Sequence, residues 1–480
     1  MKRIAIIGGG IAGLAAAYEL ELARKLGAKL DWTLYEASNR LGGTVETTQR
    51  GGFVIEGGPD GWVSEKPWAR DLAVELGLEG QLIASNDETR KTYILMEGKL
   101  EAMPDRMRMM VPEDLKTLEG STLFSPAARE AYANELRRAD ELREAAPLGD
   151  ESVASFVKRH FGEEVLEKIA APLLSGVFGG DVAKLSVGAV MPGFVTMERE
   201  HGSLIAAVQA KAKARGNKAQ QSIFTSLRNG MGSLVEAIVA KLPTERVHLN
   251  RSALSVRQEG KLWCLRVSTP AEKGRLGKSK KHFSHVLFAT PADITRALLE
   301  PLDAALPTLI PQHSSSAVLA AFCWPADSAR AINVPQGFGF LVPQSARRDD
   351  EPQILACTFV DQKFPNRTPS KARLIRVFFG GTSADEFAGK SDHDVAGVAF
   401  AQLESILGKL PSPDAALTTV CRWPRSLPQY EVGHMERMAK LDTHIAALRG
   451  LTLLGNSYRG VGLPDLIRDA REAARKIVQA

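Results

Sequence analysis

Cysteine, aromatic residues and long apolar runs are all scarce in this sequence. Its 480 residues include four cysteines, and aromatic side chains make up 6%. The cysteines lie far apart and form no C-x-x-C pair, which argues against a disulfide framework and against a zinc site. We therefore expect no bound metal and reduced, buried thiols, as in a cytoplasmic protein, at Cys264, Cys323, Cys357 and Cys421.

The apolar runs are short. No stretch of about 18 uninterrupted apolar residues occurs, so the sequence predicts no transmembrane helix. Lys2-Arg3 followed by an apolar segment resembles the start of a signal peptide. Glu19 and Glu21 follow closely, however, and the apolar segment belongs to a nucleotide-binding pattern. We therefore interpret it as part of the folded protein.

Charge is nearly balanced. The formal net charge is +5, and 44% of the residues are hydrophobic. At about 150 residues per domain this length is enough for roughly three domains. The one basic run, Lys273 to Lys281, lies between two strand-like segments and predicts a solvated hairpin loop, so nucleic-acid binding is not indicated. The nine histidines are scattered, and the sequence identifies no catalytic residue.

The most informative stretch follows the first strand-like run, Ile4 to Ile7. Three glycines at positions i, i+2 and i+5 precede an Ala- and Leu-rich helical pattern, and the motif comprises Gly8, Gly9, Gly10, Ile11, Ala12 and Gly13. Such spacing permits a tight turn, close approach of a pyrophosphate and close packing of helix on strand. A second strand-like run ends in Glu36, where an acidic residue can bind an adenosine ribose. A dinucleotide site is predicted.

The next residues favour FAD over NAD. Glu36-Ala37 is followed by Arg40 and by Gly42-Gly43. The arginine can bind phosphate with its forked guanidinium, and the glycines allow close approach of the backbone to a cofactor. This segment resembles the E-x-x-x-R-x-G-G signature of the flavin amine-oxidase-like superfamily, which binds FAD through residues that here include Glu36, Ala37, Arg40 and Gly43.

Three later segments resemble one branch of that superfamily, the oxygen-dependent, FAD-containing protoporphyrinogen IX and coproporphyrinogen III oxidases. Ala171 to Ser186 is similar to P-x-x-S-G-V-[YF]-x-G-D-x-x-x-L-S. Arg422 to Tyr430 is similar to R-W-x-x-x-[AL]-P-Q-Y, and Gly455 to Asp465 to G-N-x-Y-R-G-V-G-[IL]-P-D. The resemblance covers the whole chain.

The resemblance implies further cofactor-binding residues. The turn Gly58-Pro59-Asp60-Gly61 is expected near the flavin, Val247 on a returning strand, and Trp423 beside the ring. The last FAD motif contributes Gly455, Asn456, Val461, Gly462 and Leu463. A helix that begins at this motif can direct its positive dipole end at the negative charge that accumulates on reduced flavin.

The expected fold is α/β: a Rossmann-like FAD-binding domain of the flavin monooxygenase and amine oxidase type, a mixed α/β substrate domain and a helical insertion. The FAD domain is expected from residues 1–88, 222–292 and 421–480, and the substrate domain from a hairpin at 89–102 and from 293–420. Residues 103–221 form the insertion. Its methionines and arginines between Met103 and Met110 fit a helix that touches a membrane surface, or ordinary core packing.

The implied function is the six-electron oxidation of a porphyrinogen in haem biosynthesis, with chemistry at flavin N5 and O2 as electron acceptor. The expected substrate is protoporphyrinogen IX, with coproporphyrinogen III as the alternative. Further alternatives are a flavin oxidase of amines or polyenes, and a non-catalytic tetrapyrrole-binding flavoprotein.

Substrate binding is expected to need an apolar cavity and one or two cations for the propionates. Relatives from plants and animals carry an arginine where this chain has Thr92, so we predict Arg90 and Lys91 as the propionate-binding residues, with solvated loop residues as the alternative. The expected location is the cytoplasm. A peripheral contact with the inner face of the cell membrane and a homodimer are left open.

Overall fold

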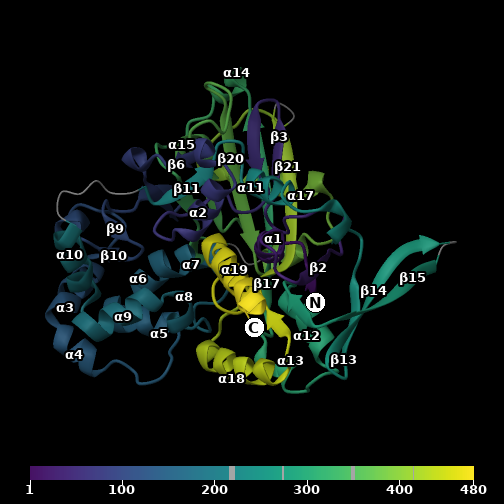
Figure 1. The fold of residues 1–480 in the computed structure, drawn as a ribbon. Helices are drawn as coiled ribbons and strands as arrows, with labels where there is room; N and C mark the ends of the chain where they lie inside the picture. The colour runs from purple at the N-terminus through teal and green to yellow at the C-terminus, as the bar shows by residue number, and fades with distance from the viewer. Residues whose placement is uncertain (216–221, 273–274, 348–351, 414–415, 480) are drawn as a thin grey trace.

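The computed structural model describes residues 1–215, 222–272, 275–347, 352–413 and 416–479. Figure 1 shows three parts: a central parallel sheet with its helices, a long antiparallel sheet, and a helical region to one side. This arrangement confirms the predicted α/β class with a helical insertion. The exact domain boundaries stay a prediction.

The central sheet has five strands in the order β12-β2-β1-β16-β22, all parallel. Strands β2 and β12 follow β1 on one side, and β16 and β22 lie on the other, so the strand order reverses between β1 and β16. Open α/β sheets bind ligands at this point, outside the carboxyl ends of the strands. The strands are β1 Lys2–Ile7, β2 Leu30–Tyr35, β12 Val247–His248, β16 His285–Phe288 and β22 Leu451–Leu453.

Alternate residues of β1 enter different cores, as expected for a strand with a side-chain period of two. Ile4 and Ile6 pack into a core formed with four helices. These are α1 Ile11–Lys25, α2 Trp68–Glu75, α11 Gly232–Val239 and α19 Leu463–Gln479. Ala5 and Ile7 face a second core. Its elements are the antiparallel sheet β13 Ala253–Glu259, β14 Leu262–Glu272 and β15 Arg275–Phe283, with α12 Ala292–Leu299, α13 Leu306–Leu309 and α18 His434–Ala447.

The second large sheet has seven strands in the order β21-β17-β20-β19-β18-β7-β8, antiparallel except for the pair β18–β7. The strands are β7 Thr92–Met96, β8 Lys99–Ala102, β17 Ser314–Trp324, β18 Gly339–Leu341, β19 Ala356–Phe359, β20 Arg373–Gly380 and β21 Leu417–Pro428. Helix α17, Asp392–Leu407, packs its apolar side chains into the core of this sheet. Short helices flank it: α14 Ala326–Ala329, α15 Val360–Lys363 and α16 Thr382–Glu386.

The helical region has its own core and lies beside the two sheets (Figure 1). Its helices are α3 Pro126–Arg137, α4 Ala139–Glu144, α5 Val153–Phe161, α6 Glu163–Val165, α7 Ala171–Phe178, α8 Val187–Val190, α9 Pro192–His201 and α10 Leu204–Arg215. A buried polar cluster crosses this core. His160 lies between two carboxylates, with Nδ1 3.0 Å from Glu135 and Nε2 3.0 Å from Glu198.

The prediction that the methionine-rich segment is helical is wrong. It forms a short hairpin, β9 Met107–Arg108 and β10 Val111–Pro112. Arg106 and Met109 have φ angles of 55° and 52°, which no right-handed helix accommodates. Met110 is fully buried at the turn, and its carbonyl accepts a hydrogen bond of 2.9 Å from the Tyr132 hydroxyl. The methionines pack on the core of the helical region.

The basic run is also different from the predicted loop. A hairpin forms, but most of the run lies within strand β15, while residues 273–274 lie outside the described residues. Strand pairing holds these charges in register with β14, as in the pair Arg266–Lys280. The hairpin projects from the body of the molecule (Figure 1).

Small sheets connect the larger parts. They are β3 Thr47–Arg50 with β4 Phe53–Glu56, and β5 Trp62–Val63, β11 Phe224–Leu227 and β6 Leu82–Ala84. Short 3₁₀ turns cover Glu79–Gln81, Asp87–Thr89, Leu115–Leu118, Thr244–Arg246 and Gln344–Ala346, and a π-helical turn covers Leu166–Ala170.

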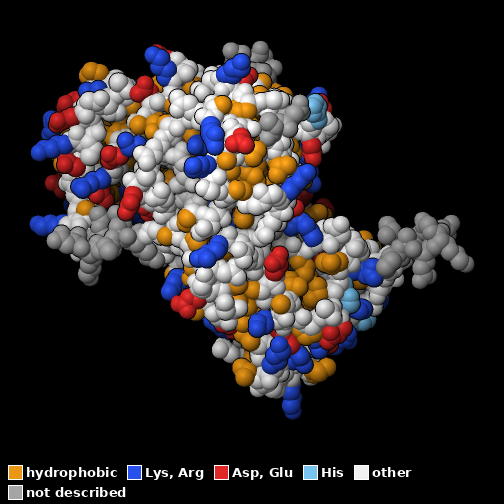
Figure 2. All heavy atoms as spheres, turned by 90° about the horizontal axis from the view of Figure 1, so that it is seen from above, with side chains coloured by type: hydrophobic (Ala, Val, Ile, Leu, Met, Phe, Trp, Pro, Cys, Tyr) orange, Lys and Arg blue, Asp and Glu red, His pale blue; other side chains and the backbone are white. Residues whose placement is uncertain are grey.

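No helix in the described ranges combines the length and the apolar character needed to cross a membrane. On the face in Figure 2, clusters of hydrophobic side chains are interrupted by charged ones. The four cysteines are free, and Cys264, Cys323 and Cys357 are buried.

Candidate functional site

The predicted nucleotide-binding residues gather at the carboxyl edge of the parallel sheet. The glycine turn follows β1, Glu36 follows β2, and Gly455 follows β22. Val247 lies on β12 and pairs with Leu34. Because all five strands are parallel, their carboxyl ends share one edge, and segments from the beginning, middle and end of the chain meet there.

The three glycines of the first turn have different surroundings. A Cβ on Gly13 would lie 2.0 Å from the Gly8 carbonyl oxygen, and one on Gly8 2.3 Å from the Ala289 carbonyl oxygen. A Cβ on Gly10 would meet nothing within 4 Å. Gly8 and Gly13 are therefore required by packing, whereas Gly10 borders open space at the start of α1.

Glu36 organises the turn beside β2. Its Oε2 accepts a 2.6 Å hydrogen bond from the Gly9 N–H, and its Oε1 accepts one of 2.8 Å from the Ser38 N–H. Ala37 lies between Glu36 and Ser38 in the sequence. Arg40 forms an ion pair of 3.2 Å with Glu46 and donates to the carbonyl of Gly43. Its guanidinium also lies over the Trp423 ring, 5.4 Å from the centroid.

The last predicted segment joins β22 to α19. Gly455 has a φ angle of 114°, and a Cβ there would meet nothing within 4 Å. Asn456 donates from Nδ2 to the Ser426 carbonyl at 2.8 Å, and its own carbonyl accepts from the Tyr430 hydroxyl. Leu463 begins α19 and is buried with α1, while Val461 and Gly462 precede it.

These surroundings fit FAD. Helices α1 and α19 both begin at the edge, and the first N–H groups of a helix have no partner within it. The N-cap of α1 is Gly10, whose missing side chain leaves those donors uncapped. Ile11, Ala12 and Gly13 thus offer N–H groups to a phosphate. Gly10 and Gly455 leave the backbone open to a ligand at two separate points.

The turn expected beside the flavin rests on buried charges. Asp60 forms an ion pair of 2.9 Å with Lys363 and one of 3.4 Å with Arg376, and Arg376 also donates to the Gly58 carbonyl. Behind it, Glu56 forms an ion pair of 3.2 Å with Arg367. Pro59 and Gly61 complete the turn.

Three cations face two carboxylates in this cluster, which leaves it net positive. Burial alone would raise the pKa of Asp60, but Lys363 and Arg376 outweigh burial and hold that pKa below its ordinary value. Burial dominates at Glu56 and raises its pKa, with Arg367 opposing. Such a cluster favours negative charge on a ligand placed against the turn.

Trp423 connects the turn to the seven-stranded sheet. It lies on β21, and its indole Nε1 donates a hydrogen bond of 2.6 Å to the Gly57 carbonyl. The neighbouring strand β17 places Ala317 opposite Trp423 on one side and opposite Gly380 on the other.

The two segments that resemble porphyrinogen oxidases are in contact. Gln429 donates from Nε2 to the Phe178 carbonyl at 2.7 Å. The Ser186 N–H donates to the Tyr430 carbonyl, also at 2.7 Å. A Cβ on Gly180 would lie 1.6 Å from Oε1 of Gln429, so a side chain there would displace the Gln429 amide.

The predicted propionate-binding residues, Arg90 and Lys91, take no part in the contacts described above. Arg90 follows a 3₁₀ turn, and Lys91 is exposed just before β7, with its carbonyl accepting from the Phe338 N–H at 2.8 Å. Neither lines the cavity between α7 and β20. Their role stays a prediction.

Sequence reasoning missed Lys363, Arg367 and Arg376. One signal was present: Arg376 stands inside the otherwise apolar run Leu374 to Phe379. A lone arginine in a buried strand must have a buried partner. Its partner Asp60 lies far away in sequence, so the pair could not be identified from the pattern.

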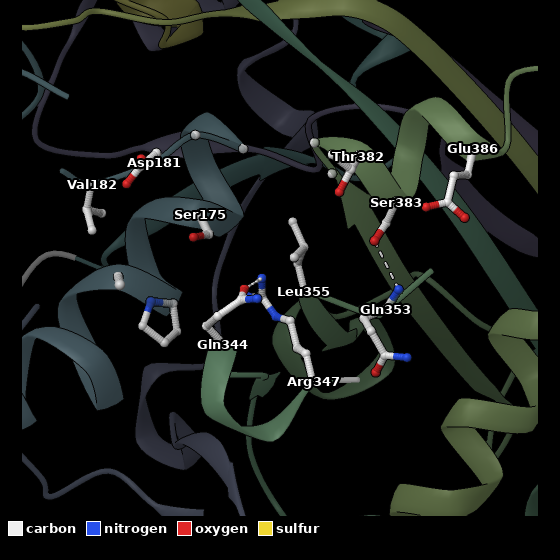
Figure 3. A pocket seen from close by; sticks show the side chains of 16 residues that line it. Ser175, Asp181, Val182, Gln344, Arg347, Gln353, Leu355, Thr382, Ser383 and Glu386 are labelled. Atoms are coloured by element: carbon white, nitrogen blue, oxygen red, sulfur yellow. Dashed lines mark hydrogen bonds between the residues drawn. The ribbon is translucent and has the colours of Figure 1, made fainter. Parts of the chain in front are cut away.

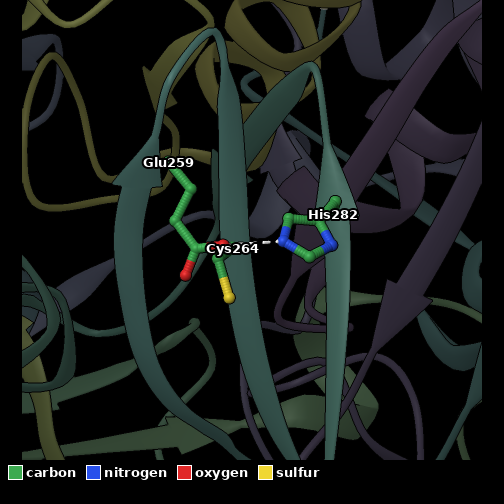
Figure 4. A group of neighbouring side chains, drawn as sticks. All are labelled: Glu259, Cys264 and His282. Carbon is green, nitrogen blue, oxygen red and sulfur yellow. Dashed lines mark hydrogen bonds and ion pairs between the residues drawn. The ribbon is translucent and has the colours of Figure 1, made fainter.

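One cluster outside this site contains metal-ligand types. Glu259, Cys264 and His282 lie on three adjacent strands, with their ligand atoms within 4.8 Å of one another (Figure 4). His282 Nε2 is 2.8 Å from Glu259 Oε2, and Lys280 forms an ion pair of 3.0 Å with the same carboxylate. The carboxylate is thus already neutralised by side chains of the protein.

Comparisons with known proteins agree with this geometry. The family described as flavin containing amine oxidoreductase matches residues 11–478. The chain is 31% identical to a coproporphyrinogen III oxidase of Bacillus subtilis (strain 168), over 98% of this chain and 97% of that protein. It is 28% identical to protoporphyrinogen oxidase 1, chloroplastic, of Arabidopsis thaliana, over 98% and 87%.

Solved structures show the same fold. A crystal structure assigned as a protoporphyrinogen oxidase from Exiguobacterium sp. 255-15 has a TM-score of 0.84 and 30% identity, covering 100% of this chain and 99% of that one. Cyclohexylamine oxidase from Brevibacterium oxydans IH-35A has a TM-score of 0.66 and 16% identity, covering 100% and 99%, and shows the fold alone.

Proposed function

Because the chain belongs to the flavin-containing amine oxidoreductase family, we propose that it oxidises a porphyrinogen to the porphyrin, removing six electrons with O2 as acceptor. The family assignment confirms the predicted flavin cofactor and the predicted oxidoreductase class. The relatives named above bear out the resemblance to porphyrinogen oxidases. The two candidate substrates are coproporphyrinogen III and protoporphyrinogen IX.

One observation carries the proposal. The segments Ala171–Ser186 and Arg422–Tyr430, which resemble this branch of the superfamily, meet through Gln429 and Ser186. The second segment also carries Trp423, which binds the Gly57 carbonyl. The residues typical of porphyrinogen oxidases therefore connect the cofactor edge to the seven-stranded sheet.

FAD, when bound, supplies the chemistry by accepting electrons from the substrate and passing them to O2. The residues of the chain position it. In our proposal the α1 N–H groups and Gly10 hold the pyrophosphate, Glu36 binds the ribose, and α19 directs its N-terminus at the ring. The buried cluster around Asp60 and Arg376 favours negative charge near the turn.

The experiment that tests this function uses the purified holoprotein with its flavin absorbance recorded. Coproporphyrinogen III and protoporphyrinogen IX are added separately in air, and porphyrin fluorescence is followed against an enzyme-free blank. We expect fluorescence to grow faster than the blank with at least one substrate, with peroxide released. The ratio of kcat/KM values then identifies the preferred substrate. No acceleration with either, despite bound flavin, contradicts the proposal.

Three predictions on location and assembly accompany the function: cytoplasmic location, a peripheral membrane contact through residues 103–221, and a homodimer. Burial of Met110 and packing of its neighbouring methionines on the core leave the arginines of that segment to provide a membrane contact. Sedimentation with anionic liposomes tests this contact, with Arg106→Gln and Arg108→Gln as variants. Light scattering measures the oligomeric state.

A further inference from the structure

A cavity of about 440 Å³ lies between the helical region and the seven-stranded sheet. One wall is α7 with the loop after it, and the other is formed by the end of β20, helix α16 and the segment around Arg347 (Figure 3). The first wall belongs to the segment that resembles porphyrinogen oxidases.

Arg347 is the cation of this cavity. Its guanidinium lies between Ser175 and Leu355 in Figure 3. It donates to the Val342 carbonyl at 2.7 and 3.0 Å and to Oε1 of Gln344 at 2.9 Å. All three bonds end on uncharged oxygens, and among the described residues no carboxylate forms an ion pair with it.

A partly buried guanidinium without a counter-ion is electrostatically expensive. Burial lowers the pKa of Arg347 to about 10, and no charge in the described ranges offsets the effect. Arginine forks match carboxylates in geometry and form strong charge-assisted hydrogen bonds. An anionic ligand would therefore offset the electrostatic cost of burying the Arg347 guanidinium.

Hydroxyl groups add further donors. Those of Ser175 and Thr382 line the cavity and have no hydrogen-bond partner in the described part of the chain. Two acids line it as well. Asp181 accepts from the Ala183 N–H at 2.9 Å, and exposed Glu386 lies on α16, away from Arg347 in Figure 3. The cation and the acids thus occupy different parts of the wall.

The cavity lies near the turn that is expected beside the flavin. Gly380 lines it, and Gly380 and Trp423 both pair with Ala317 of β17. The two residues are therefore two strand spacings apart, about 10 Å. Trp423 binds the turn expected beside the flavin. A flat macrocycle lying across these strands would extend its acidic arms toward Arg347.

We propose that Arg347 binds a carboxylate of the substrate, with the hydroxyls of Ser175 and Thr382 as further donors. This inference rests on the proposed function and names the group that recognises the propionates. It replaces Arg90 and Lys91, which precede β7, with a residue that follows the paired strand β18.

The test compares Arg347→Gln with Arg347→Lys in the holoprotein. We expect the glutamine variant to raise KM for coproporphyrinogen III by about tenfold or more, since a hydrogen bond to a charged group is lost, while kcat changes by less than about twofold. The lysine variant should recover part of the loss. Arg330→Gln removes an exposed arginine and is the matched charge control.

A second readout does not depend on oxidation. Coproporphyrin III, which carries carboxylates, and its tetramethyl ester, which carries none, are titrated into the protein and followed by fluorescence. Arg347→Gln should weaken binding of the acid about tenfold and leave binding of the ester unchanged. Glu386→Gln should strengthen binding of the acid, and this variant serves if Arg347→Gln does not fold.

The outcomes separate the two proposals. Failure of the wild-type protein to oxidise either porphyrinogen overturns the function, whereas the acid-to-ester comparison still decides on Arg347. Unchanged KM and binding in a folded Arg347→Gln variant overturn the inference. A loss shown instead by Arg90→Gln or Lys91→Gln assigns the carboxylate to the residues predicted from the sequence.

Discussion

The carboxyl edge of the parallel sheet and the charged cluster at the Asp60 turn are built in different ways. At the edge, backbone atoms form the proposed FAD site: Gly8, Gly10 and Gly13 shape the turn, and two helices would contribute their first N–H groups. The charged cluster is made of side chains: Arg367 is buried and paired with Glu56, and Arg376 is buried and paired with Asp60.

The difference determines how each region tolerates change. A site made of backbone depends on the absence of side chains, so an added methyl group can break it. A site made of buried charges depends on complete pairing, so removal of one partner leaves another uncompensated. The four predictions below test this distinction, from the largest expected effect to the smallest.

Gly13→Ala should have the largest effect. Its Cβ would lie 2.0 Å from the Gly8 carbonyl oxygen, so helix α1 must move away from β1. We expect loss of bound flavin and little folded protein, measured by flavin absorbance and circular dichroism. Gly10→Ala is the matched control, since its Cβ has open space and Gly10 has a φ angle of −70°. Its apoprotein should keep the melting temperature of the wild-type apoprotein, while its flavin affinity falls. A normal flavin content in Gly13→Ala would contradict the packing argument.

Arg367→Met should come next. It leaves Glu56 buried beside Thr47 without its cation, and breaking a buried ion pair costs about 3–5 kcal/mol. Urea unfolding near pH 8 measures the loss of free energy of unfolding. The double variant Glu56→Gln/Arg367→Met should recover a large part of it. If the double variant is as unstable as the single one, charge is not the cause.

His160→Gln should destabilise the helical region in a pH-dependent way. Burial would lower the pKa of His160, but its hydrogen bonds to Glu135 and Glu198 outweigh burial and raise it above 6.5. A raised histidine pKa stabilises the fold fully below the unfolded-state pKa of about 6.5, and the contribution is lost as pH rises through the folded-state value. We expect a cost of about 2 kcal/mol at pH 6 and less at pH 9. An equal cost at both pH values would show that folding does not raise the pKa of His160.

Trp423→Phe should have the smallest effect. It removes the donor to the Gly57 carbonyl and keeps most of the apolar ring. One lost hydrogen bond costs about 1 kcal/mol. Thermal unfolding measures the loss, and the flavin absorbance maximum tests whether Trp423 lies beside the ring. Val420→Ala on the same strand is a control that removes apolar contacts only. An unchanged melting temperature would show that water replaces the indole.

The backbone-made site was predictable from sequence because its signals are local. Glycine spacing, a preceding apolar strand and a following helix lie within a few residues of one another, and the structure brings Gly8, Glu36 and Gly455 to one edge as expected. The Ala- and Leu-rich pattern after the glycines forms helix α1, as predicted.

The side-chain site was not predictable, since its partners are distant in sequence. Asp60 and Arg376 are far apart in the sequence. They form an ion pair because the seven-stranded sheet places β20, which carries Arg376, beside the Asp60 turn. Arg347 gives no sequence signal at all, because surface and cavity arginines look alike in a loop. The hairpin at Met107 was missed for a related reason: its turn depends on burial of Met110 against Tyr132 rather than on glycine or proline.

The order of the strands in the parallel sheet has a consequence for biosynthesis. Strand β1 is made early, but β22, which pairs with β16, and α19, which packs on α1, are encoded from Leu451 onward. A ribosome must therefore translate both the helical region and the seven-stranded sheet before the proposed FAD site is complete. Flavin uptake would then report on completed chains: a product terminated within β21 would contain Gly8, Gly10 and Glu36 but lack Gly455 and α19, the last part of the proposed FAD site.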